Sequence, residues 1–244
     1  MTRHAAGLAV AAVLVTGCGG QARDGAKGSA ALRALHDPSL AAPVTAAPSG
    51  PLGARLRRPT VLRSGPGGQV LARVGLRTAY GSARVFAVAG WRGDWVAVRA
   101  PHRTDDRPVW VAAGDVALRS EPWTLVADLS ERTLTLRRAG RVRGRWMVSV
   151  GAPQTPTPIG RFGVTDLLAE PPGSPYGCCI LALSGHQTRF RPGWNGGTRL
   201  AIHGTPDEAT LGSADTNGCL HLGHRALRRL LATVPLGATV TIRA

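Results

Sequence analysis

The sequence predicts a mainly β protein with two folded parts, a small β module over residues 55–119 and a larger β-rich domain over residues 122–244. Three observations predict this. Short runs of alternating apolar and polar residues recur along both parts, and Gly, Pro and Asp residues separate them, as in strands joined by turns. Only residues 226–233 carry a helical period. Apolar residues make up 43% of the 244 positions, which is enough to form a core.

The first 18 residues predict export. A short basic segment, residues 1–4, precedes an apolar run of 11 residues, 5–15, which is too short to span a bilayer and fits a signal peptide. The sequence Leu-Val-Thr-Gly-Cys at 14–18 resembles a lipobox. We therefore expect residues 1–18 to be a lipoprotein signal peptide, Cys18 to carry the lipid, and the protein to be extracytoplasmic and anchored to the membrane. An ordinary secretory signal with an incidental cysteine is the alternative.

Residues 19–54 are rich in Ala, Gly, Pro and Ser and have no sustained period, which predicts a disordered tether. The module that follows has strand-like runs at residues 60–63, 69–74, 84–89, 94–99 and 109–112. Its segments 93–98 and 109–116 resemble bacterial SH3-like domains, which implies a small SH3-like β-barrel. Trp91, Trp95 and Trp110 are expected in the barrel core, with a ligand-stacking face as the alternative. The module is either a binder of wall glycan or peptide, or a spacer.

The larger domain is also rich in predicted strands, at residues 125–128, 133–136, 141–150, 198–202 and 238–242. Ala139-Gly140 supplies a hairpin turn. The stretches 166–178 and 186–198 are polar and rich in Gly and Pro, which predicts loops. Leucines at 227, 230 and 231 give the helix at 226–233 one apolar face.

A histidine and a cysteine 16 positions apart, His203 and Cys219, carry the chemistry, and each has a neighbouring glycine. A thiol is a useful nucleophile only as the thiolate, and a histidine within hydrogen-bond reach can take its proton and leave an ion pair. Gly204 lets the backbone turn behind the histidine. Gly218 removes side-chain bulk where a substrate carbonyl would approach, so that nearby backbone N–H groups can hold an oxyanion.

Residues 124–244 resemble the catalytic domain of the L,D-transpeptidases, the YkuD-type family of bacterial cell-wall enzymes. The specific part is Ile-His-Gly-Thr at 202–205 together with Thr-Asn-Gly-Cys at 216–219. A second signature is Thr-Pro-Thr-Pro-Ile-Gly-Arg-Phe at 155–162. Further matching segments lie at residues 126–136, 148–151, 181–186 and 234–237. The resemblance implies a β-sandwich-like catalytic domain with one or two short helices, and no metal or organic cofactor.

The family also implies a reaction. Cys219 would attack the carbonyl of the third residue of a peptidoglycan stem tetrapeptide, with His203 as base and the Gly204 carbonyl orienting the imidazole. The oxyanion would rest on N–H groups near Asn217, Gly218 and Cys219, and a second stem would take the acyl group in a 3→3 cross-link. Carbapenem-type β-lactams would acylate the same thiol. Further candidates for substrate contact are Thr216, His221, Tyr176 and His186.

Two positions depart from the family pattern. Asn217 stands where the family usually has histidine, and His221 stands where it usually has arginine. Asparagine can still form hydrogen bonds, whereas His221 is shorter than arginine and largely neutral at pH 7. Two alternatives therefore stay open, a catalytically degenerate wall-binding lipoprotein and an L,D-carboxypeptidase that uses water as acceptor. A third is a zinc peptidase that uses His203, Cys219, His221 and His224.

The adjacent Cys178 and Cys179 are expected not to bridge each other. Their Cα atoms must lie about 3.8 Å apart, below the usual disulfide range of roughly 4.4–6.8 Å. We expect packing thiols on a strand, with a regulatory bond from either cysteine to Cys219 as the alternative.

The net charge of +16 comes almost wholly from arginine. These arginines are dispersed and accompany no nucleic-acid motif, so nucleic acid is not an expected partner. Genomic compositional bias and attraction to anionic wall polymers or a membrane surface both explain the charge.

Overall fold

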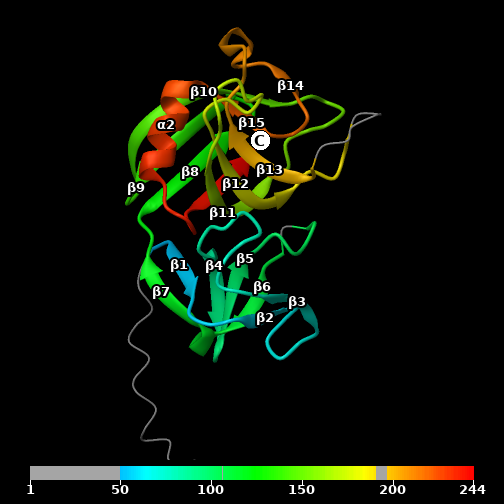
Figure 1. Ribbon diagram of the computed structural model, residues 1–244, viewed down its shortest axis with the longest axis vertical. Coiled ribbons are helices and arrows are strands. Elements are labelled where there is room, and N and C mark those ends of the chain that lie inside the picture. The colour runs from blue at the N-terminus through cyan, green and yellow to red at the C-terminus, as the bar shows by residue number, and fades with distance from the viewer. Residues whose placement is uncertain (1–49, 106, 191–196) are drawn as a thin grey trace, which may run out of the picture. The chain divides into compact units, whose positions relative to one another are not determined.

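The computed structural model describes residues 50–105, 107–190 and 197–244, and its strands form two sheets (Figure 1). The expected signal peptide with Cys18, and all but the end of the expected tether, lie outside the described residues. The described residues all belong to one compact unit, residues 48–244. No helix among them is long and apolar enough to cross a membrane.

The first sheet is antiparallel throughout, in the order β3-β2-β6-β5-β4-β1-β7. Its strands are β1 Leu52–Leu56, β2 Thr60–Arg63, β3 Val70–Val74, β4 Val85–Arg92, β5 Trp95–Arg99, β6 Val109–Ala112 and β7 Val116–Ser120. Five of them fall on the expected runs. β1 begins at Leu52, within residues expected to be tether, because its apolar side chains are buried against this sheet. The SH3-like nature of the module stays a prediction.

The core under this sheet is mostly aliphatic, and the expectation that Trp91, Trp95 and Trp110 fill it is wrong. Trp91 is 51% exposed, and the other two indoles are half-buried. Trp110 alternates along β6 with the fully buried Val109 and Val111, so its side chain lies on the opposite face of the strand.

The second sheet follows the order β14-β10-β15-β13-β12-β11-β16-β8-β9, and β10 also pairs with β9, so this sheet closes on itself. Its strands are β8 Trp123–Asp128, β9 Thr133–Arg138, β10 Arg141–Gly151, β11 Gly160–Ala169, β12 Cys179–His186, β13 Arg199–His203, β14 Ala214–Thr216, β15 Leu220–Leu222 and β16 Thr239–Arg243. The expected mainly β fold is confirmed. Three pairs are parallel: β10 with β14, β13 with β15, and β8 with β16.

Local sequence explains the connections in this domain. Ala139 and Gly140 have φ of +47° and +78°, as a tight hairpin turn between β9 and β10 requires. Helix α2, His224–Thr233, buries Leu227 and Leu230 in the same core as the sheet. One expectation needs correction. Residues 166–169 belong to β11, because their backbone pairs with β12 from Cys179 to Ala182.

The two sheets touch through β4 and β11. A Cβ atom placed on Gly163 would lie 2.9 Å from the Cβ of Ala87, so only glycine permits this close approach. Arg119 of β7 also donates a hydrogen bond of 2.7 Å to the carbonyl of Leu236. The first sheet therefore packs directly against the domain that carries His203 and Cys219.

Candidate functional site

Two parallel strands bring the histidine and cysteine segments together. In the pairing of β13 with β15, Ile202 lies opposite Leu220 and His203 opposite His221. Cys219 directly precedes β15, so both segments reach the same edge of the domain. A pocket of about 540 Å³ opens there. Six of the expected site residues line it: Tyr176, His203, Thr216, Asn217, Cys219 and His221.

His203 has a defined tautomer. Its Nδ1 lies 2.7 Å from the carbonyl oxygen of Gly204, and a carbonyl only accepts hydrogen bonds, so Nδ1 carries the hydrogen and Nε2 keeps its lone pair. Burial, followed by the nearby His221, lowers the pKa of His203 to about 4, while the bond to Gly204 acts in the opposite direction. The imidazole is therefore neutral at pH 7 and can accept a proton at Nε2.

A turn before β12 covers this histidine. The Tyr176 ring stands edge-on to the His203 ring at 5.0 Å between centroids, and its carbonyl accepts a hydrogen bond of 2.7 Å from the Gly204 N–H. A Cβ atom on Gly204 would lie 2.9 Å from the Cα of Gly177 and 3.0 Å from the Tyr176 carbonyl oxygen. Glycine at 204 thus permits the close contact that fixes both Tyr176 and His203.

Cys219 is a free thiol, but it does not contact His203 in the way expected. Its Sγ lies 3.9 Å from the carbonyl oxygen of Arg199, and no hydrogen bond between described residues joins it to the imidazole. Burial raises the pKa of the thiol to about 11. Burial thus favours the neutral form of both groups in this arrangement.

The loop before Cys219 is held by the side chain of Thr216, which is buried. Its hydroxyl donates to the Cys219 carbonyl at 2.6 Å and accepts from the Gly218 N–H at 3.0 Å. Gly218 has φ of +111°, which L side chains rarely adopt. The Gly218 N–H, expected as an oxyanion donor, is thus engaged within the loop.

Sequence reasoning missed Gln187. Its buried side-chain amide donates to the carbonyls of Thr155, Pro156 and Asn217 at 3.1, 2.9 and 3.2 Å. A Cβ atom on Gly218 would collide with the Gln187 side chain, so glycine at 218 is also needed for packing. A lone glutamine in a polar stretch gives no signal of this role.

The remaining expected residues divide between the pocket and its surroundings. The His221 ring lies 4.5 Å from the His203 ring, and burial lowers its pKa while Asp215 raises it. The side-chain oxygen of Asn217 is buried and accepts no hydrogen bond from the described residues. His186 does not line the pocket. Its ring nitrogens lie 3.0 Å from the Pro101 carbonyl oxygen and 2.9 Å from the Thr198 hydroxyl.

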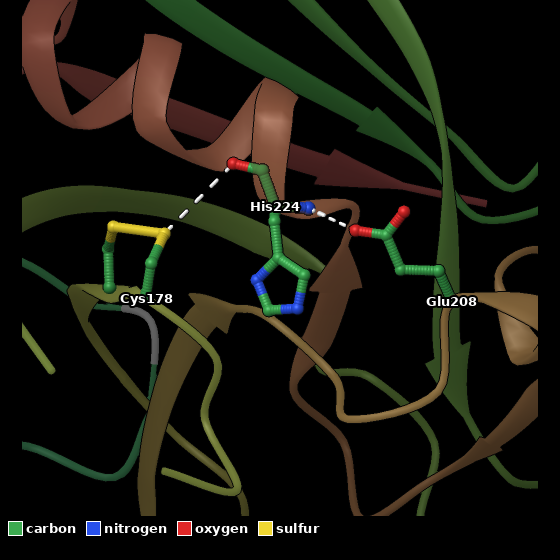
Figure 2. The surroundings of a disulfide bond; sticks show 4 residues. Cys178, Glu208 and His224 are labelled. Atoms are coloured by element: carbon green, nitrogen blue, oxygen red, sulfur yellow. Dashed lines mark hydrogen bonds between the residues drawn. A yellow bond between two sulfur atoms is a disulfide. The ribbon is translucent and has the colours of Figure 1, made fainter. Parts of the chain in front are cut away.

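Contrary to expectation, Cys178 and Cys179 are joined by a disulfide bond (Figure 2). The Cα separation is indeed 3.8 Å, but Cys178 belongs to the turn and only Cys179 to β12. Strand alternation therefore does not force the two side chains to opposite faces. Cys178 Sγ also lies 4.0 Å from the His224 carbonyl oxygen at the start of α2, a contact drawn as a dashed line in Figure 2. Because these cysteines pair with each other, neither is bonded to Cys219.

In the described part of the chain, no group of three or more His, Cys, Asp or Glu residues is placed to hold a metal ion. The residues of the zinc alternative are therefore not arranged as ligands.

Comparison with known proteins agrees with the geometry. Residues 122–242 match the family model described as the YkuD L,D-transpeptidase catalytic domain. This segment belongs to the YkuD family. The Bacillus subtilis protein YkuD is 31% identical over 121 residues, which is 50% of this chain and 66% of that protein. YqjB of the same organism is 27% identical over 146 residues, or 55% of this chain and 78% of that protein.

A solved structure gives a weaker likeness. L,D-transpeptidase 3 from Mycobacterium tuberculosis, in complex with a faropenem-derived adduct, has a TM-score of 0.44 and 17% identity. The match covers 56% of this chain and 67% of that one. The YkuD family assignment rests on the sequence matches, and all residues that line the pocket of His203 and Cys219 except Tyr80 lie within the matched segment.

Proposed function

We propose that this YkuD-family protein is a peptidoglycan L,D-transpeptidase that forms 3→3 cross-links through an acyl-enzyme on Cys219. The observation that carries the proposal is the shared pocket of Cys219 and His203, in which the Gly204 carbonyl leaves Nε2 of the imidazole free to accept a proton.

The first half-reaction begins with rotation of the thiol away from the Arg199 carbonyl, a change of one side-chain torsion. Because the free thiol has a pKa of about 11, the proton passes to His203 Nε2 as sulfur attacks, rather than beforehand. The attacked carbonyl belongs to the third stem residue. Its oxygen becomes an oxyanion held by backbone N–H groups of the loop other than that of Gly218, and the bond to D-alanine breaks as the imidazolium protonates the leaving amine.

In the second half-reaction, a side-chain amine of a neighbouring stem attacks the thioester and gives its proton to His203. The C–S bond breaks, the new amide forms, and the imidazole returns the proton to the thiolate. Water in place of the amine gives the L,D-carboxypeptidase alternative. The same attack on a carbapenem opens the β-lactam ring and leaves a stable adduct on Cys219.

A catalytically degenerate wall-binding protein is the second candidate. Two features favour it: the hydrogen bond found for the thiol goes to the Arg199 carbonyl, and His221 stands where the family usually has arginine. Incubation with a carbapenem separates the two candidates, because a mass increase of one inhibitor molecule requires a working nucleophile.

The decisive experiment uses a defined disaccharide-tetrapeptide and mass analysis of the products. We expect cross-linked dimers and free D-alanine from the native protein, and neither from the Cys219→Ala variant. Monomeric tripeptide without dimers would identify the carboxypeptidase. Full activity of Cys219→Ala would refute the nucleophile assignment. His186→Ala is the control, because His186 lies outside the pocket, and this variant should keep the activity of the native protein.

We further propose that the enzyme acts outside the cytoplasmic membrane, anchored by a lipid on Cys18. The lipobox-like segment at 14–18 and the preceding apolar run support this. Mass spectrometry of the N-terminal peptide tests it, and an unlipidated mature N-terminus at another residue would contradict it.

A further inference from the structure

A second cavity, of about 200 Å³, adjoins the Cys219 pocket. Residues of the first sheet and its loops, including Thr78, Arg84 and His102, form one side of it, and Asp166 and Arg199 of the YkuD-family domain form the other. Tyr80 and Arg199 line both this cavity and the Cys219 pocket. The first module therefore helps to build a space beside the proposed nucleophile.

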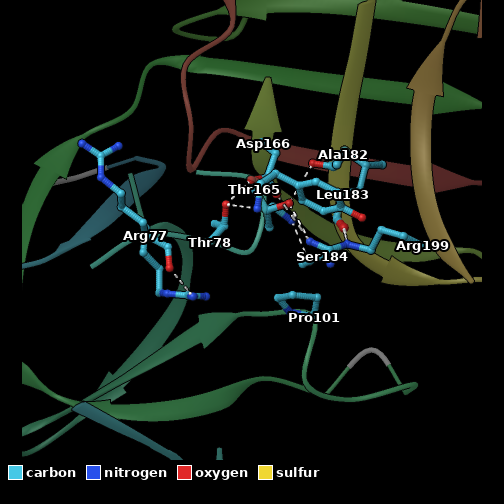
Figure 3. Close-up of polar contacts among 12 residues, drawn as sticks. Arg77, Thr78, Pro101, Thr165, Asp166, Ala182, Leu183, Ser184 and Arg199 are labelled. Carbon is cyan, nitrogen blue, oxygen red and sulfur yellow. Dashed lines mark hydrogen bonds and ion pairs between the residues drawn. The ribbon is translucent and has the colours of Figure 1, made fainter. Parts of the chain in front are cut away.

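Asp166 places an unsatisfied acceptor at this cavity. Its side chain is fully buried, and Oδ1 accepts a hydrogen bond from the Thr78 hydroxyl (Figure 3). Oδ2 lies 3.8 Å from Nη2 of Arg199 and accepts no hydrogen bond from the described residues. A buried carboxylate oxygen without a donor is costly, so a ligand that brings an N–H group would satisfy it.

The guanidinium groups around the cavity are held by backbone carbonyls and one hydroxyl. Arg84 donates to the carbonyls of Gly75 and Arg77 at 2.7 and 2.6 Å. Arg199 donates to the Leu183 carbonyl and, at 2.7 Å, to the Thr165 hydroxyl. These bonds fix the positions of two cations at the cavity without using all of their donors.

The charge of the cavity is unbalanced. Arg84 and Arg199 supply two positive charges against one negative charge on Asp166. Burial and the two arginines lower the pKa of His102 to about 4, so this imidazole is neutral at pH 7. Its Nδ1 is buried and has no hydrogen-bond partner among the described residues. The cavity thus lacks one donor near Asp166 and one negative charge near the arginines.

We propose that this cavity binds an α-amino-acid end, an ammonium and a carboxylate on one carbon atom. The ammonium donates to Asp166 Oδ2, and the carboxylate accepts from Arg84 and from the Nδ1–H tautomer of His102. The identity of the molecule that supplies this ligand rests on the proposed function. Such an end is present in the D-alanine that the reaction releases, and in the side chain of a diaminopimelate residue of the stem. A lysine side chain supplies only the ammonium.

The first test measures binding without turnover, by calorimetric titration of the full chain carrying Cys219→Ala. D-alanine should bind at least about tenfold more tightly than propionate or isopropylamine, each of which keeps one of its two charged groups. Asp166→Asn and His102→Ala should each weaken D-alanine binding by about tenfold or more. His102 Nδ1 has no hydrogen-bond partner among the described residues, so His102→Ala breaks no such bond and should fold. This variant therefore still tests the proposal if Asp166→Asn does not fold. Arg77→Gln is the control, because Arg77 donates to the Gly81 carbonyl and does not line the cavity.

The second arm distinguishes the sources. Tetrapeptide stems with diaminopimelate or lysine at the third position are titrated into the same protein. A tighter complex with the diaminopimelate stem, abolished by Asp166→Asn, identifies the side-chain end as the ligand. Equal stem affinities with saturable D-alanine binding identify the released amino acid.

The proposal is overturned if D-alanine does not bind saturably and the two stems bind equally. It is also overturned if Asp166→Asn and His102→Ala both leave the affinities for D-alanine and the stems unchanged, which would indicate that only water fills the cavity. Normal cross-linking by the native protein in that case would leave the proposed function standing. Conversely, if D-alanine binds but the native protein shows neither turnover nor a carbapenem adduct, only the proposed function is refuted.

Discussion

Gln187→Met provides a sharp test of how the nucleophile loop is held. The substitution keeps the length of the side chain but removes its amide. In the native protein this amide donates to three carbonyls, including that of Asn217, and its oxygen accepts from the backbone N–H groups of Thr188 and Arg189 at 2.8 and 3.0 Å. Methionine satisfies none of these groups, and the site is too enclosed for water to replace them all, since Gln187 is only 5% exposed.

The expected loss of stability follows from these contacts. The two hydrogens of the amide nitrogen and the two bonds to the amide oxygen make about four hydrogen bonds, each contributing about 1 kcal/mol net. We expect the free energy of unfolding to fall by about 4 kcal/mol, at the upper end of single substitutions. Turnover should fall as well, because the carbonyl of Asn217 loses one of the contacts that link the loop to the Thr155–Pro156 segment.

Urea unfolding followed by tryptophan fluorescence measures the first effect, and D-alanine release measures the second. Gln69→Met, an exposed glutamine before β3, is the matched control and should change stability by less than about 0.5 kcal/mol. A loss below about 1 kcal/mol for Gln187→Met, with normal turnover, would refute the bracing role of this amide.

Three further predictions concern the site. Alkylation of Cys219 by iodoacetamide should be slow at pH 7 and rise steeply above pH 9, because burial raises the thiol pKa to about 11; a plateau reached below pH 8 would show a preformed thiolate. Stability should fall as the pH drops from about 6.5 to about 4. The unfolded chain binds the His203 proton at its ordinary pKa of 6.5, and the folded chain binds it only near pH 4. Below pH 4 the free energy of unfolding is therefore lower by about 3 kcal/mol. The stability of His203→Gln should fall by about 3 kcal/mol less over the same pH range, because only the contribution of His102 is common to both proteins. Parallel stability curves for the two proteins would contradict the lowered pKa of His203. Gly204→Ala should lower kcat at least about tenfold, because its Cβ would approach the Tyr176 carbonyl and displace the bonded imidazole; unchanged kinetics would show that the contact is dispensable.

Most of the strands were predictable because they alternate apolar and polar residues between Gly and Pro turns. The pocket followed from motifs whose residues are close in sequence, since His203 ends β13 and Cys219 directly precedes β15, the strand that pairs with it. The position of the sulfur was not predictable in this way. Its contact with the Arg199 carbonyl depends on a side-chain torsion inside the folded pocket.

Other features depend on long-range packing and carry no local signal. Gln187 lies in a stretch of ordinary loop composition, and its three acceptors come from two other segments. The Cys178–Cys179 bond depends on the point at which the turn ends and β12 begins. Tryptophans of a small barrel usually fill its core, but here valines on the alternate positions of β5 and β6 do so.

The placement of β16 has a consequence for how the YkuD-family domain assembles. This strand, which follows the domain's other strands along the chain, lies between β11 and β8 and pairs with both. Until it docks, the β8–β9 hairpin has no neighbour on the β8 side, and β11 presents an unpaired edge. Closure of the sheet must therefore await synthesis of residues 239–243, and ribosome-bound fragments that stop before them should remain sensitive to protease.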